Sequence, residues 1–229
     1  MKKVLVTGAT GSIGEAIVRY FANNGYFVYI HYNSNETKAK EILHSIPNGE
    51  IIKFNATSKE DIKATLDGIE VDVLVNNLGI IKDGLFFFMD DNDWESVLNT
   101  NLNSLYYVTK AILPSMMSNK SGSIVNISSI SGLVGNVGQV NYSTTKGGIF
   151  SFTKALCLEV ARYNIRVNSV APGIIESEMT KDLDKGMKNQ IPCKRFGKPD
   201  EVAEVVFFLG DKGTYMNGEI INVSGGMVR

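Results

Sequence analysis

The sequence predicts an α/β protein built on one doubly wound parallel sheet of the Rossmann type, with about seven strands and helices on both faces. Short β-branched runs alternate with helical apolar patterns along the whole chain, which is typical of parallel sheets. The first of these runs leads straight into a glycine-rich turn and a helix. Because no repeat or linker-like stretch interrupts the alternation, we expect residues 1–229 to form a single domain.

Each element follows from its local pattern. Apolar runs of strand length predict strands near 3–7, 27–31, 50–54, 71–76, 122–128, 165–170 and 219–223. Apolar residues at helical spacing predict helices near 13–24, 35–46, 59–67, 99–118, 141–163 and 199–210. Ligands of such sheets bind beyond the carboxyl ends of the strands. Residues 8–14, 76–79, Ser129 and 172–173 each follow a predicted strand, so we expect them at one edge.

Composition is that of an ordinary soluble globule, with 44% hydrophobic residues, 21% charged residues and a formal net charge of -1. Nothing in this balance points to nucleic acid or a membrane as a partner. The two cysteines and the two histidines (Cys157, Cys193, His31, His44) do not cluster, so we expect no metal site. The chain begins directly with a strand and holds no apolar stretch of membrane length, so we expect a cytoplasmic location.

The glycine-rich turn predicts a nucleotide site. The buried run at 4–7 enters the sequence Gly-Ala-Thr-Gly-Ser-Ile-Gly at 8–14, and helical spacing follows at 15–21. Glycines let the backbone turn tightly and approach a pyrophosphate, while the helix start supplies free N–H groups and a positive dipole end. Strand, turn and helix in this order are the context that a dinucleotide-binding motif requires.

The end of the second predicted strand bears on the choice of cofactor. An acidic residue there binds the ribose 2′-hydroxyl of NAD and repels a 2′-phosphate, but positions 31–35 hold no acid. Asn33 and Ser34 can donate hydrogen bonds to a phosphate, so NADP(H) is favoured. No arginine stands ready for the 2′-phosphate, and NAD(H) is therefore not excluded. We expect His31 to be an exposed loop residue.

A second group of residues predicts proton transfer. Tyr142 and Lys146 are four residues apart, so on a helix they lie on one face. A nearby ammonium is expected to favour the phenolate and to lower the pKa of the phenol toward the working range. Ser129 closes the preceding strand and can hold an oxygen beside the phenol. Taken alone, the pair indicates an amphipathic helix with a snorkelling lysine, and it is the nucleotide turn that favours the functional interpretation.

Taken in order, these motifs resemble the short-chain dehydrogenase/reductases over almost the entire length. They comprise Thr7-Gly8 with Gly14, the Asn-Asn-x-Gly segment at 76–79, Asn101, Ser129, Tyr142-x-x-x-Lys146 and Pro172-Gly173. The stretches at 81–89, 135–148, 171–179 and 218–226 look like the 3-oxoacyl-(acyl-carrier-protein) reductases in particular. Alone, Asn101 would be a solvated or capping residue of a helix, and its functional interpretation depends on the neighbouring motifs.

The resemblance implies a reaction and a role for each matching residue. A hydride passes from the nicotinamide to a ketone carbon while Tyr142 gives a proton to the oxygen. Ser129 holds that oxygen, Lys146 binds the nicotinamide ribose and tunes Tyr142, and Asn101 completes a proton relay. Gln139 matches a position on the substrate side. Implied cofactor contacts are Gly8, Thr10, Gly11, Ser12, Ile13, Gly14, Asn33, Ser34, Asn55, Asn77, Gly79, Tyr142, Lys146, Pro172, Gly173, Ile175 and Ser177.

Four positions depart from the family's usual pattern. Gly11 stands where NADP-using relatives often carry arginine, and Leu78 replaces a small alanine, so it should crowd the adenosine channel or shift the strand end. Ser177 retains the hydroxyl of the usual threonine, and Asn55 replaces an aspartate that lies against the adenine. These departures affect the choice of cofactor more than the catalytic residues.

The leading hypothesis is NADPH-dependent reduction of a 3-oxoacyl thioester, carried by acyl carrier protein or CoA, in fatty-acid or related acyl-chain synthesis. Lys120 and Arg162, the second of them one residue from the matching position, partly fit the basic residues that would meet an acidic carrier, although solvated surface charge is the default explanation for both. Residues 85–89 and 178–196 are expected to shape the substrate entrance. The alternatives are a dehydrogenase of a small alcohol, sugar or steroid, and a non-catalytic NADP-sensing regulatory protein. The family is typically tetrameric, and helices at 99–118 and 141–163 would form part of a homotetramer interface.

Overall fold

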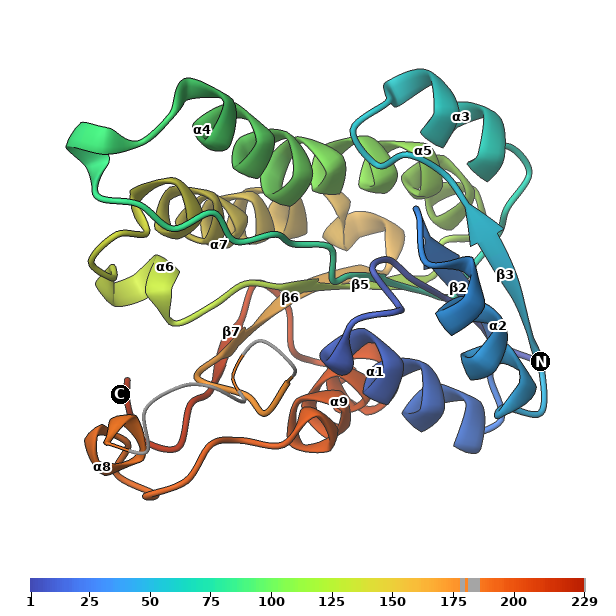
Figure 1. Ribbon diagram of the computed structural model, residues 1–229. Coiled ribbons are helices and arrows are strands. Elements are labelled where there is room, and N and C mark those ends of the chain that lie inside the picture. Colours follow the sequence, from blue (N-terminus) through green and yellow to red (C-terminus); the bar gives the residue numbers. More distant parts are fainter. Residues whose placement is uncertain (178–179, 181–185, 229) are drawn as a thin grey trace.

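Seven parallel strands form one sheet in the order β3-β2-β1-β4-β5-β6-β7 (Figure 1). This arrangement comes from a computed structural model that describes residues 1–177, 180 and 186–228. The strands are Lys3–Val6 (β1), Phe27–Tyr32 (β2), Gly49–Lys53 (β3), Val73–Asn76 (β4), Gly122–Ile127 (β5), Ile165–Pro172 (β6) and Ile220–Val223 (β7). The predicted doubly wound sheet is confirmed, and each strand lies within about two residues of its expected position.

Helices cover both faces of the sheet (Figure 1). They are Ser12–Asn23 (α1), Glu36–His44 (α2), Lys59–Leu66 (α3), Asp91–Leu98 (α4), Ser104–Asn119 (α5), Ser131–Val134 (α6), Val140–Val160 (α7), Met187–Gln190 (α8) and Pro199–Phe207 (α9). Short 3₁₀ or π turns occur at Phe86–Phe88 (η1), Asn99–Asn103 (η2), Ala161–Tyr163 (η3) and Phe208–Lys212 (η5). All the predicted helices are present, and α4, α6 and α8 are additions.

The strands bury both of their faces, which explains their nearly continuous apolar sequences. Val4 and Val6 of β1 pack in one cluster with side chains of α1 and α9. Leu5, between them, packs in a second cluster with side chains of α5 and α7 on the other face. Successive side chains of a strand point to opposite faces of the sheet, and the core is therefore divided into two layers. The same alternation determines which face each side chain at a strand end points to.

The region before the predicted helix at 99–118 is helical as well. Asp90 caps α4 by accepting a hydrogen bond from the Asn92 N–H at 2.8 Å, and Asp91 and Asp93 lie in its first turn, where acidic side chains favour a helix. The π turn η2 then joins α4 to α5. Such wider turns often occur at functional sites because they reorient side chains within a helix. Here the turn contains Asn101, which is 1% exposed.

Two glycines shape the turn after β1. Gly8 has φ +61°, a left-handed conformation that glycine adopts without strain. Gly14, in the first turn of α1, lies so close to that turn that a Cβ atom there would approach the Gly8 carbonyl oxygen to 2.3 Å and the Ala9 Cα to 2.8 Å. The close approach holds the helix start against the end of β1.

Gly14→Ala is expected to lower the free energy of unfolding by about 2 kcal/mol or more, because the turn must shift to admit the new methyl group. Alanine normally favours a helix over glycine by about 1 kcal/mol, so a loss here reverses the usual effect. Urea denaturation would measure it. Gly11→Ala is the matched control, since its Cβ would meet only the Gly8 oxygen at 3.6 Å, an ordinary contact. Equal stability of the two variants would contradict the close approach.

Candidate active site

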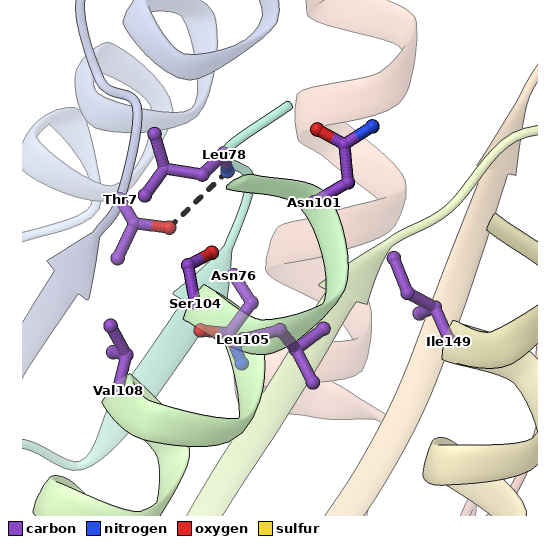
Figure 2. A pocket seen from close by; sticks show the side chains of 8 residues that line it. All are labelled: Thr7, Asn76, Leu78, Asn101, Ser104, Leu105, Val108 and Ile149. Carbon is purple, nitrogen blue, oxygen red and sulfur yellow. Dashed lines mark hydrogen bonds between the residues drawn. The ribbon is translucent and has the colours of Figure 1, made fainter. Parts of the chain in front are cut away.

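The ends of β1 and β4 are joined directly at the carboxyl edge of the sheet. The Thr7 hydroxyl oxygen accepts hydrogen bonds from the N–H groups of Asn77 at 3.0 Å and Leu78 at 3.3 Å, and Figure 2 shows the second of these. The Asn77 side-chain amide donates to the carbonyl oxygens of Thr7 at 3.1 Å and Gly8 at 3.0 Å. The predicted meeting of the glycine-rich turn with the 76–79 segment is therefore observed.

Leu78 does not displace the strand end. β4 keeps a regular parallel register with both of its neighbours, β1 and β5. The Leu78 side chain packs against the α5 and α7 face and borders a small cavity (Figure 2). Its Cδ2 atom would lie 3.3 Å from a Cβ placed on Gly8, so it lies against the phosphate-binding turn. The cavity is lined by Thr7, Asn76, Leu78, Asn101, Ser104, Leu105, Val108 and Ile149.

The start of α1 is suited to bind an anion. Gly11 is the N-cap residue, and no described side chain caps the first turn. The first N–H groups of a helix have no partner within the helix, so they remain available to a phosphate. Thr10, Ser12 and Ile13, the other predicted contacts of this turn, are partly exposed beside it. The turn therefore fits a dinucleotide pyrophosphate, on the basis of its own geometry.

The predicted adenosine side lies at the ends of β2 and β3. Asn33 and Ser34 follow β2 and are exposed, as the phosphate-contact prediction requires. Asn55 follows β3, and its side-chain oxygen accepts from Thr57 N–H at 3.0 Å and from the Thr57 hydroxyl at 2.8 Å. The Asn55 N–H donates to Asp61 at 2.5 Å. These bonds fix the Asn55 backbone next to the place where an adenine would lie.

The prediction that His31 is an exposed loop residue is wrong. His31 belongs to β2, is 0% exposed and stacks on the Phe54 ring with 3.8 Å between ring centroids. Burial lowers the pKa of the imidazole to about 4, although a hydrogen bond to the Phe54 carbonyl and the Asp61 charge oppose this shift. Its sequence context, between strand and turn, gave no sign of burial because the covering ring comes from Phe54, which follows β3 and lies 23 positions away.

Ser129, Tyr142 and Lys146 come together beside the same sheet edge. Ser129 follows β5, while Tyr142 and Lys146 lie one turn apart in α7. The Lys146 ammonium lies 5.5 Å from the centroid of the Tyr142 ring and donates to the Ile127 carbonyl at 2.9 Å. Lys146 is only 3% exposed, so the alternative of a lysine snorkelling into solvent is wrong.

Burial, rather than the ammonium, dominates the titration of these groups. The pKa of Tyr142 is raised, first by burial; Ser129 lowers it by hydrogen bonding and the Asp83 charge raises it. The pKa of Lys146 is lowered to about 8 by burial alone. The expectation that the ammonium lowers the pKa of the phenol is therefore corrected: the pKa of Tyr142 is raised, and Lys146 is not among the groups that shift it, because its ammonium is directed to the Ile127 carbonyl.

Asn101 is held between two elements of the site. Its side-chain oxygen accepts from Ile80 N–H at 2.8 Å, and its amide donates to Ile80 O at 3.0 Å and to the Thr145 hydroxyl at 3.3 Å. A Cβ on Gly79 would lie 3.3 Å from Lys146 Nζ and 3.7 Å from Asn101 Oδ1, so the glycine leaves space beside both. Asn101 is thus neither solvated nor a cap, and it links the end of β4 to α7.

Gln139 is engaged by an acid that sequence reasoning missed. Its amide nitrogen donates to the two Asp83 carboxylate oxygens at 3.0 and 3.1 Å, and its oxygen accepts from Asn136 at 3.0 Å. Gly84 N–H donates to Gly138 O at 2.8 Å nearby. These bonds join the loop after β4 to the start of α7. A single aspartate in a loop gave no signal in the sequence, because its partner lies 56 positions away.

The end of β6 supplies the last predicted contacts. Pro172 ends the strand, and Gly173 N–H donates to Val223 O at 2.9 Å. A Cβ on Gly173 would come within 2.9 Å of Ser224 Cα, so only glycine fits without movement. Ile175 is 7% exposed, and Ser177 N–H donates to the Thr180 hydroxyl at 2.8 Å.

The predicted substrate entrance is described in part. Phe86, Phe87 and Phe88 are 69%, 89% and 78% exposed in η1, so this apolar segment is available to a ligand or a partner. Of the predicted segment 178–196, residues 178–179 and 181–185 lie outside the described part of the chain.

The basic residues expected near the mouth lie elsewhere. Lys120 ends α5 and precedes β5, while Arg162 lies in η3 before β6, with its guanidinium 4.9 Å from the Tyr163 ring centroid. Both therefore belong to the amino-terminal edge of the sheet, opposite the site. Parallel topology separates them from the mouth of the same chain, and the expectation that they flank it is corrected.

Metal-binding clusters and membrane-spanning helices are both absent from the part of the chain that the structure describes. It contains no group of three or more histidine, cysteine, aspartate or glutamate residues that could hold a metal ion. None of its helices has the length and apolar character needed to cross a membrane.

The fold and the site define a nicotinamide-dependent oxidoreductase, and comparison with known families agrees. The family model described as short chain dehydrogenase matches residues 2–188, so the chain belongs to the short chain dehydrogenase family. A 3-oxoacyl-(acyl-carrier-protein) reductase of Aquifex aeolicus (strain VF5) is 45% identical over 99% of this chain and 97% of that protein. Proteins of the same name from Thermotoga maritima and Vibrio harveyi are each 40% identical over 99% of this chain and 98% and 97% of their own lengths.

Asp83→Asn is expected to lower the pKa of Tyr142, because the Asp83 carboxylate opposes formation of the phenolate and the amide does not. The pKa is measured by absorbance titration of Asp83→Asn and of the double variant Asp83→Asn/Tyr142→Phe. The difference between the two titrations isolates the ionisation of Tyr142. Asp93→Asn is the matched control, since it removes a nearby exposed carboxylate that pairs with Lys82. An unchanged or higher Tyr142 pKa in Asp83→Asn would contradict the electrostatic role.

Proposed function

We propose that this chain reduces a 3-oxoacyl thioester, carried by acyl carrier protein, to the 3-hydroxyacyl thioester with NADPH, in fatty-acid or related acyl-chain synthesis. The observation that carries the proposal is the convergence of Ser129, Tyr142, Lys146 and Asn101 at the sheet edge that holds the glycine-rich turn. The full-length similarity to reductases of that name supports the choice of substrate.

In this proposal Tyr142 is the proton donor. Reduction of a ketone requires a donor that is protonated at neutral pH, and the raised pKa of Tyr142 keeps the phenol in that state. Ser129 holds the carbonyl oxygen, and the bound nicotinamide supplies the hydride. Lys146, with a pKa of about 8, lies between the phenol and the space beside Gly79, where it would bind the nicotinamide ribose. Asn101 fixes the Ile80 backbone beside this space.

NADPH is proposed over NADH because positions 31–35 hold no acid to repel a 2′-phosphate. Asn33 and Ser34 are exposed at the end of β2, where the phosphate would lie. The residues that would hold the dinucleotide are Gly8, Thr10, Gly11, Ser12, Ile13, Gly14, Asn33, Ser34, Asn55, Asn77, Gly79, Tyr142, Lys146, Pro172, Gly173, Ile175 and Ser177.

A homotetramer remains a prediction. Some apolar residues of α5 and α7 are buried in the core, and others are exposed. Leu105 on α5 and Ile149 on α7 are 4% and 1% exposed, so these two apolar side chains belong to the core and do not form an outward face. Tyr106 on α5 and Leu158 on α7 are 45% and 81% exposed and remain available to a second copy. The carrier protein as a partner also remains a prediction, and so does a cytoplasmic location.

Tyr142→Phe is expected to lower kcat for acetoacetyl-CoA reduction by about 10²–10⁴-fold, because general acid catalysis contributes about that much. The dissociation constant of NADPH should change by no more than about twofold, since the phenol ring remains. Initial rates and fluorescence titration measure the two. Tyr215→Phe, which alters a fully exposed tyrosine, should leave both unchanged. If turnover survives Tyr142→Phe, another group donates the proton.

The same assay separates the rival functions. A dehydrogenase of a small alcohol, sugar or steroid would turn over members of a free-alcohol panel faster than the thioester. A regulatory protein would bind NADPH and show no turnover of either. The proposal requires thioester reduction to dominate.

Asn33→Asp is expected to lower kcat/KM for NADPH by about tenfold or more while changing that for NADH little, because the carboxylate would repel the 2′-phosphate. Unaltered chain should prefer NADPH by at least about tenfold in the same assay. Asn48→Asp adds the same charge at an exposed position just before β3, at the opposite edge of the sheet, and serves as the control. Equal effects on both cofactors would show that the 2′-phosphate does not lie at Asn33.

A further inference from the structure

His31 contacts two main-chain groups through its ring. The Gly8 N–H lies 3.1 Å from Nδ1, and the Phe54 carbonyl oxygen lies 3.1 Å from Nε2. An amide N–H only donates and a carbonyl oxygen only accepts, so Nδ1 must be unprotonated and Nε2 must carry the hydrogen. The geometry therefore selects one neutral tautomer of the imidazole.

The same residue holds the next position of the turn through its main chain. The His31 carbonyl oxygen accepts a hydrogen bond from Ala9 N–H at 3.1 Å. On its other side, the Gly8 carbonyl oxygen accepts from Gly11 N–H at 3.3 Å and from the Asn77 amide at 3.0 Å. Gly8 is thus held at its N–H by His31 and at its carbonyl oxygen by Asn77 and Gly11. These bonds set the orientation of the N–H groups that follow Gly8.

His31 also reaches the opposite end of the nucleotide site. Its ring stacks on Phe54, and Phe54 immediately precedes Asn55, the residue predicted to lie against the adenine. One buried ring therefore spans from the phosphate-binding turn after β1 to the adenine-side segment after β3. None of the motifs that carry the family resemblance of this chain includes position 31.

We propose that His31 is a positioning residue for the dinucleotide: it fixes the phosphate-binding turn relative to the segment that follows β3. The inference rests on the cofactor of the proposed function and goes beyond it, because His31 itself need not touch the cofactor. The ring is fully buried, so loss of its nitrogens leaves the Gly8 N–H and the Phe54 carbonyl without their partner. The turn can then rotate, and its alignment with a bound pyrophosphate is lost.

Titration does not interrupt this role at ordinary pH. Burial lowers the pKa of His31 to about 4, and Asp61 is the charged group that opposes the shift. The imidazole is thus neutral throughout the range in which a reductase would work. It acts as a fixed support and not as a pH switch.

His31→Phe tests the proposal, because it keeps an aromatic ring on Phe54 and removes both nitrogens. Isothermal titration with NADP⁺ should give a dissociation constant about tenfold higher than that of the unaltered chain. Ile112→Val is the control: it removes a methyl group from the buried cluster that also contains Phe54 and keeps both hydrogen bonds of His31. It should lower stability in urea while leaving the NADP⁺ dissociation constant within about twofold.

An unchanged dissociation constant in His31→Phe would overturn the proposal. An equal rise in Ile112→Val would also overturn it, because a general packing defect would then explain the result. The KM for acetoacetyl-CoA at saturating NADPH should stay within about twofold in His31→Phe. A general loss of structure would instead weaken the binding of both NADP⁺ and acetoacetyl-CoA. Absence of acetoacetyl-CoA reduction by the unaltered chain would count against the proposed function alone, since NADP⁺ binding is measured without turnover.

Nitrogen NMR of the unaltered chain provides a test that does not depend on a variant's folding. The chain has two histidines, and His44→Gln, at an exposed helix position, assigns the signals of His31. The expected spectrum at pH 7 has a protonated Nε2 and an unprotonated Nδ1 that accepts a hydrogen bond. A protonated Nδ1, or an imidazolium, would overturn the proposal.

Discussion

The position of β1 between β2 and β4 is the constraint on which the site depends. β1 pairs in parallel register with both neighbours, and the chain leaves it toward β2 before crossing to β4. At such a reversal the connections on the two sides diverge, which opens a crevice at the carboxyl edge. Thr7 is the first residue past β1, and its hydroxyl oxygen accepts hydrogen bonds from Asn77 and Leu78 past β4. These bonds tie the ends of the two strands together at this edge.

A second constraint is the helical run from α4 through η2 to α5. A regular helix would turn Asn101 away from its present neighbours, but the π turn presents its amide to Ile80 and Thr145. The loop after β4 is thereby tied to α7, which carries Tyr142 and Lys146. Main-chain bonds at one side and side-chain amides at the other position Tyr142 and Lys146, the residues proposed to transfer the proton.

Local signals predicted most of this and long-range contacts account for the rest. Strand positions, the glycine-rich turn and the spacing of Tyr142 and Lys146 depend on neighbouring residues, so the sequence pattern contained them. His31 and Asp83 acquired their roles from Phe54 and Gln139, which lie 23 and 56 positions away. Helix α4 was not predicted from the sequence for a different reason. Asp90 was a local signal for the start of a helix, but the helix that follows it contains few apolar residues.

Electrostatics at Tyr142 follows from the same burial that stabilises the core. A buried phenol beside a buried lysine tends toward the neutral pair, because each charged form loses solvation. The Asp83 charge adds to this tendency, and Ser129 alone among the contributing groups opposes it. A protonated phenol is the form that donates to a developing alkoxide. Burial and the Asp83 charge therefore keep Tyr142 in the form that the proposed reduction requires, and they act on the protonation state of the phenol and not on the direction of the reaction.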